Sequence, residues 1–115
     1  MTPDHDGEAR TSFWSDAHLA VEHLDLARLA ELLNSGADVQ DPDQFGFTLL
    51  HHAVDSEADA AIQTGTELHV DLTALLLARQ ADPTAADNEG RTPLSMARGG
   101  YHWLAADLLE AWLAR

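Results

Sequence analysis

The sequence predicts an all-α fold in which about three pairs of helices are stacked side by side. A turn segment occurs clearly twice, as Asp43-Gln44-Phe45-Gly46-Phe47-Thr48-Leu49-Leu50-His51 and as Asp87-Asn88-Glu89-Gly90-Arg91-Thr92-Pro93-Leu94. Only its tail is kept near the N-terminus, as Ala17-His18-Leu19-Ala20. An apolar helical segment that closes on a small residue and an aspartate also occurs twice, at 32–39 and 76–83. Such repetition is typical of units that bury their apolar faces only by stacking on one another.

These segments resemble the ankyrin repeat, whose pattern combines Asp-x-x-Gly-x-Thr-Pro-Leu-His-x-Ala, two short antiparallel helices and Leu-Leu-x-x-Gly-Ala-Asp. The resemblance runs from about Phe13 to the C-terminus. It implies a solenoid with repeats at about 13–42, 43–86 and 87–115, preceded by a disordered acidic tail at 1–12. Three positions depart from the pattern: Leu49 replaces the proline, Ser95 replaces the histidine, and Gln80 replaces the glycine that ends the second helix.

The elements follow in order. The first repeat contains an apolar stripe at helical spacing, formed by Leu26, Leu29, Leu32 and Leu33. Gly36 follows it and can adopt the left-handed conformation that ends a helix. Thr48 and Thr92 are the expected N-caps of the next inner helices, and Pro93 suits a first helical turn. The inner helices begin with Leu50, Ala53 and Val54 and with Leu94 and Ala97. The outer helices contain Val70, Ala74, Leu75 and Leu77, and Leu104, Leu108 and Leu109.

The middle repeat is longer than the pattern requires. Gly46 and Gly90 are 44 positions apart, as are Gly36 and Gln80, whereas the repeat period is about 33 residues. Roughly 11 extra residues therefore lie between the two helices of this repeat, within 55–72. Longer helices could absorb part of the excess, and Gly65 is the expected break. Insertions in repeat arrays often map to a face that binds.

Composition limits the possible functions. The net charge is −14 and all six basic residues are arginines, which disfavours nucleic acid and favours solubility or a basic protein partner. The chain lacks cysteine, so it has neither disulfides nor thiolate metal sites. The acidic N-terminus resembles no secretion signal and no apolar run could span a bilayer, so we expect a cytoplasmic protein that does not bind membranes.

The turn tips are the expected binding region. Phe45 and Phe47 flank Gly46 at one tip, where aromatic side chains fit the profile of interface hot spots. In the geometry that the resemblance implies, the concave partner-binding face comprises Asp41, Gln44, Phe45, Phe47, Asp55, Ser56, Glu89 and Arg91. His51 matches the motif histidine, whose implied role is hydrogen bonding to backbone near the turn. Phe13 and Trp14 at one end, and Trp103 and Trp112 at the other, are expected to cover the ends of the stack.

The most consistent interpretation is a protein-binding module without enzymatic activity or cofactor, either a monomer or a weak homodimer. A specific hypothesis is an immunity or antitoxin-like protein that blocks a basic toxin such as a nuclease. The alternative is a metal sensor or metal-dependent enzyme whose ligands gather around the insertion: His52, Asp55, Glu67, His69 and Asp71. A third possibility is an assembly role for the C-terminal helix with its tryptophans. The sequence contains no catalytic elbow, phosphate loop or dinucleotide fingerprint.

Overall fold

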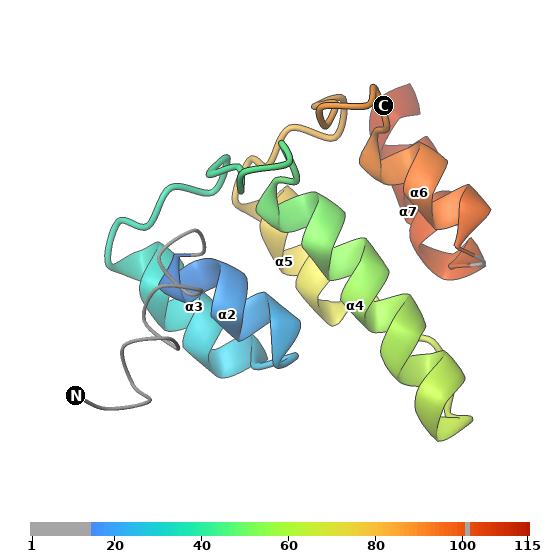
Figure 1. The fold of residues 1–115 in the computed structure, drawn as a ribbon, viewed down its shortest axis with the longest axis horizontal. Helices are drawn as coiled ribbons and strands as arrows, with labels where there is room; N and C mark the ends of the chain where they lie inside the picture. Colours follow the sequence, from blue (N-terminus) through green and yellow to red (C-terminus); the bar gives the residue numbers. More distant parts are fainter. Residues whose placement is uncertain (1–14, 101) are drawn as a thin grey trace.

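The computed structural model describes residues 15–100 and 102–115, and all regular structure in these residues is α-helical (Figure 1). In chain order the helices are α2 (Asp16–Glu22), α3 (Leu26–Asn34), α4 (Leu49–Thr64), α5 (Asp71–Ala78), α6 (Pro93–Gly99) and α7 (Trp103–Ala114). The all-α prediction is therefore confirmed.

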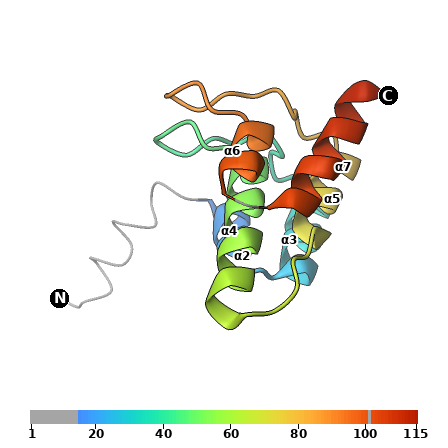
Figure 2. The same ribbon diagram turned by 90° about the vertical axis from the view of Figure 1, so that its right-hand side faces the viewer.

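The helices form three neighbouring pairs: α2 packs on α3, α4 on α5, and α6 on α7. Helix α4 also contacts α2 and α6, and α3 contacts α5, so successive pairs share apolar surface. Figure 2 shows α2, α4 and α6 in one layer and α3, α5 and α7 in a second layer. One continuous core of leucines, alanines and a few other aliphatic side chains lies between the layers. Ala53, Ala97 and Ala105 are fully buried and allow neighbouring helices to approach closely.

The inner helices begin where the sequence predicts. Thr48 accepts a hydrogen bond from the backbone N–H of His51 and forms a capping box with that residue at the start of α4. Thr92 forms the corresponding capping box with Ser95 at the start of α6, and Pro93 occupies the first turn. The replacement of the motif histidine by Ser95 thus preserves the cap.

Helices α3 and α5 are each followed by a residue in the left-handed conformation. Gly36 has φ +102° just after α3, and Gln80 has φ +76° just after α5. In both places the following N–H bonds back to a helix carbonyl, Ala37 to Leu32 at 3.0 Å and Ala81 to Leu76 at 2.9 Å. Gln80 therefore ends its helix as a glycine would, at a steric cost of about 1–2 kcal/mol.

The extra residues of the middle repeat mainly lengthen α4. This helix has 16 residues, against seven in each of α2 and α6, and extends well past them in Figure 1. Gly65 ends it with φ +67°, as the sequence predicts, and a connection at 65–70 leads to α5. The insertion is therefore largely a continuation of the first helix, and only part of it lies between the helices. Val70 precedes α5 as its N-cap residue and does not lie within that helix.

The two ends of the stack differ from the expectation in part. Trp112 is half-buried against the core and stacks with Arg115, whereas Trp103 is 63% exposed and covers little apolar surface. The predictions for the 1–12 tail and for Phe13 and Trp14 concern positions outside the described residues. No helix in the described part of the chain is long and apolar enough to cross a bilayer.

Candidate interaction surface

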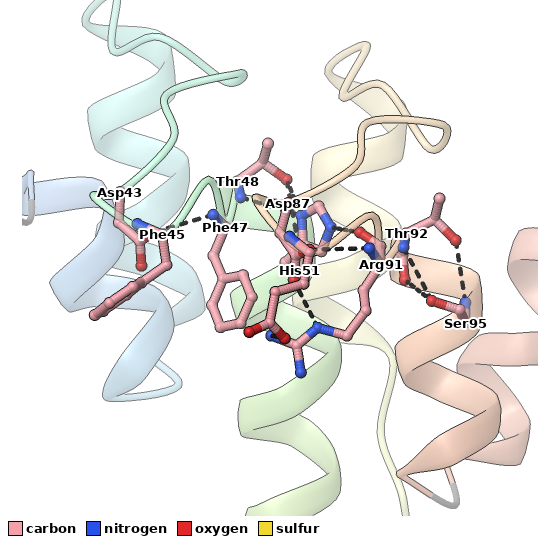
Figure 3. A network of polar contacts seen from close by, with 10 residues as sticks. Asp43, Phe45, Phe47, Thr48, His51, Asp87, Arg91, Thr92 and Ser95 are labelled. Carbon is pink, nitrogen blue, oxygen red and sulfur yellow. Dashed lines mark hydrogen bonds and ion pairs between the residues drawn. The ribbon is translucent and has the colours of Figure 1, made fainter.

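Two turn tips, 43–47 and 87–91, project on the side of the α2–α4–α6 layer (Figure 2). An aspartate builds each tip. Asp43 Oδ1 accepts hydrogen bonds from the backbone N–H groups of Phe45 and Phe47, at 2.8 and 3.0 Å. Asp87 Oδ1 accepts the equivalent bonds from Glu89 and Arg91, at 2.8 and 2.9 Å (Figure 3). The two tips are therefore copies of one carboxylate-centred turn.

The tips are bonded to each other as well as to the helices. The backbone N–H of Asn88 donates to the carbonyl of Phe45 at 2.9 Å, and its side-chain amide donates to the carbonyl of Gln44 at 3.2 Å. Gly46 makes this approach possible, because a Cβ there would lie 2.6 Å from Asn88 Oδ1. The tips therefore form one pre-organised unit, and a partner that binds them need not first order two separate loops.

Phe47 stacks with the His51 ring and with the Arg91 guanidinium, and this stack supports the tips. Phe47 lies nearly parallel to the His51 ring with centroids 5.7 Å apart, and the Arg91 guanidinium lies 5.2 Å from the centre of the Phe47 ring. Arg91 Nε also donates to Asp87 Oδ2 at 2.8 Å. Phe47 is therefore half-buried and contributes to the packing of the tips, although part of it remains accessible. Phe45 on the same tip is 56% exposed.

His51 links the middle repeat to the next tip. Its Nδ1 accepts from the backbone N–H of Thr48 at 3.1 Å, so Nε2 carries the proton and donates to the carbonyl of Arg91 at 2.8 Å. The structure thus confirms hydrogen bonding of His51 to backbone near the turn. Burial is the main cause that lowers the pKa of His51, although the Arg91 carbonyl opposes it.

Two histidines that contact each other, His52 and His18, lie near the first tip. His52 Nε2 donates to Asp43 Oδ2 at 2.8 Å, and its ring meets the buried His18 ring edge-on at 5.2 Å. Burial raises the pKa of Asp43, but the hydrogen bonds from His52 and from the tip amides outweigh this effect and hold it below its usual value. Burial and the nearby His52 lower the pKa of His18, against the opposing influence of the Phe47 carbonyl and of Asp41 and Asp43.

Five of the eight expected binding residues belong to the two tips. Gln44, Phe45, Phe47, Glu89 and Arg91 lie on the two tips, and all but Phe47 are exposed. Asp41 precedes the first tip and is half-buried, and Asp55 is exposed on α4. Ser56 differs, because it is only 8% exposed and can offer little surface to a partner.

The residues of the metal alternative have other environments. His52 is buried against Asp43 and His18, while Glu67, His69 and Asp71 line a hollow beside the 65–70 connection. Within the described ranges, no three histidine, aspartate or glutamate side chains converge as metal ligands would.

A buried carboxylate network was not predicted from the sequence. Glu57 Oε2 accepts from the backbone N–H groups of Leu72 and Thr73, at 2.9 and 3.3 Å, and so caps the first turn of α5. Glu57 Oε1 accepts from Thr73 Oγ1 at 2.6 Å and from His102 Nε2 at 3.1 Å. A weak sequence signal points to this network: α5 follows Val70, whose side chain cannot accept a capping hydrogen bond, so another group must cap the helix.

No protein-family model matches this chain, and no curated protein sequence is similar to it. A functional assignment therefore depends on the residues and their geometry.

Proposed function

We propose that this chain is an ankyrin-type solenoid that binds a basic protein through its two tips and the inner helices beside them. The tip motif, the capping boxes of Thr48 and Thr92 and the bridge from His51 to the next tip support the ankyrin-type assignment. The three helix pairs and their shared core fit the same architecture.

The main observation behind the binding proposal is that hydrogen bonds hold the two tips together. Their backbone is fixed by the two aspartates and by Asn88, so the exposed Phe45 is presented on a rigid support. A rigid aromatic side chain can enter a partner's pocket without a large loss of conformational entropy. Gln44 and Glu89 beside it could form the polar rim of such an interface.

Charge supports a basic partner. The net charge of −14 produces a field that speeds encounter with a cationic surface and repels acidic partners. Asp41, Asp55 and Glu89 lie on the proposed surface, whereas Arg91 is engaged by Asp87 and Glu89. A specific form of the proposal is an immunity or antitoxin-like inhibitor of a basic toxin, acting in the cytoplasm as a monomer or weak homodimer.

A capture experiment at two salt concentrations tests the proposal. The purified chain is immobilised and exposed to lysate of its source cells at about 50 mM and about 0.5 M salt, where the screening length falls several-fold. We expect a basic protein to be retained at low salt and weakened at high salt. Phe45→Ala should reduce retention about tenfold or more, whereas Trp103→Ala should not, because that exposed tryptophan belongs to α7 in the other layer.

A retained partner that is neutral or acidic, or capture that ignores salt, would contradict the electrostatic part of the proposal. Equal losses from Phe45→Ala and Trp103→Ala would contradict the assignment of the tips as the binding surface.

A further inference from the structure

The 65–70 connection lies at the end of the helices opposite the tips (Figure 1). A cavity lies beside this connection. Its volume is about 210 Å³. Three parts of the chain line it: the turn between α2 and α3, the extension of α4, and the 65–70 connection with the first turn of α5. The cavity is lined by Leu24, Leu26, Leu72, Glu67, His69 and Asp71, among others, with Glu57 on the inner side.

One side of the cavity is aliphatic. Leu24 and Leu26 are 42% and 39% exposed, and Ala60, Ala61 and the buried Leu72 continue the apolar surface. Leu24 has φ +56°, a left-handed conformation that glycine or asparagine would adopt at lower cost. A leucine therefore stands on the surface at a position where local backbone preference alone would favour another residue.

The rim of the cavity carries two carboxylates, with the imidazole of His69 between them in the sequence. Glu67 and Asp71 are exposed, and neither forms an ion pair with any described residue. None of the described arginines lines the cavity. Glu57 on the inner side already accepts bonds from the α5 N-terminus and His102, so the carboxylates available to a ligand are those of the rim.

We propose that this cavity receives an arginine side chain of a partner protein. The aliphatic stem of arginine matches the leucine and alanine surface, and its terminal cation matches the rim carboxylates. Arginine fits better than lysine because its planar guanidinium presents several donors at once, can serve two carboxylates, and is more weakly hydrated. The site is separate from the tips and does not depend on their function.

The probe for the test is N-acetyl-arginine methylamide, added to the full chain with isotope-labelled leucine methyl groups. We expect saturable shifts of the Leu24, Leu26 and Leu72 methyl signals with a dissociation constant of about 1 mM, as suits one small side chain. The citrulline analogue, which has the same shape without the charge, should bind at least about tenfold more weakly.

Two kinds of variant separate binding from folding. Glu67→Gln combined with Asp71→Asn removes the rim charges and should weaken the probe about tenfold, if each exposed ion pair contributes somewhat under 1 kcal/mol. Leu24→Gly removes part of the apolar wall while relieving the left-handed strain, so it should bind the probe several-fold more weakly and unfold no more easily. Gln80→Gly makes the same kind of backbone change away from the cavity and should bind like the parent chain.

Three results would overturn the proposal: no saturable shift at any soluble probe concentration, equal binding of the citrulline analogue, or shifts confined to leucines that do not line the cavity. Unchanged affinity in both the rim and the Leu24→Gly variants would do the same. None of these results bears on Phe45 and the tips, so the failure of one site is distinguishable from the failure of the other.

Discussion

Replacing His51 tests whether the tips are held by the bridge between repeats. The side chain is fully buried and serves two purposes: it completes the capping box at Thr48, and it donates to the Arg91 carbonyl. Loss of the cap should remove about 1 kcal/mol. Loss of the bridge, with a carbonyl left unsatisfied, should remove about 1–3 kcal/mol. We therefore expect His51→Ala to lower the free energy of unfolding by about 3 kcal/mol.

Two further variants divide this total. His51→Ser keeps a hydroxyl at the capping position, as Ser95 does naturally in α6. It should lose the bridge and the packing of the ring on Phe47 but not the cap, about 2 kcal/mol. Ser95→Ala removes an exposed cap that bridges to no later repeat, and should lose only about 0.5–1 kcal/mol. Urea unfolding followed by circular dichroism gives all three free energies, provided that the transitions are two-state.

Any other order of stability among these three variants would contradict the roles assigned to His51. If His51→Ser is as stable as the parent chain, the bond to the Arg91 carbonyl contributes nothing. If His51→Ala and His51→Ser are equally destabilised, the capping contribution is absent. If Ser95→Ala is as damaging as His51→Ala, the loss cannot be assigned to contacts between repeats.

The remaining predictions concern backbone strain and pH. Gly46→Ala should destabilise the chain about 1–2 kcal/mol more than Gly90→Ala, because both glycines have positive φ but only the first faces the other tip; equal losses in urea unfolding would contradict the contact. Gln80→Gly should raise stability by about 0.5–1 kcal/mol by relieving left-handed strain, and a lower thermal midpoint would refute this. Because His18 and His51 have lowered pKa values when folded, their contribution to stability is present above pH 6.5 and is lost as pH falls below it; a flat free energy of unfolding between about pH 7.5 and 5.5 would contradict this.

Local signals were sufficient where the determinants are close in sequence. Thr48, Thr92, Pro93 and Gly65 were placed correctly as caps and breaks, because capping depends on residues within about one turn. The role of His51 toward backbone followed from the repeat motif rather than from spacing alone. The surface position of Phe45 also followed from the motif, since tip residues precede each cap in the same order.

Contacts between distant residues were not predictable in the same way. The bond from Asn88 to Phe45 joins residues from two repeats, and the pairing of Glu57 with His102 spans 45 positions. Neither has a periodic signature. Ser56 was expected on the binding face, but it lies one position away from the exposed Asp55 and so turns toward the core. A difference of one residue on a helix rotates a side chain by about 100°.

The extension of α4 contains most of the residues by which the middle helix pair exceeds the other two. The additional helical turns leave the tips in place, because the helix is extended at the end opposite the tips. The longer connection leaves α5 without a local cap, and Glu57 from the extension supplies one. The same carboxylate accepts from His102 at the start of α7, so one side chain joins the extension to both following outer helices. The insertion is therefore anchored into the stack, and its surface beside Leu24 and Leu26 lines the cavity.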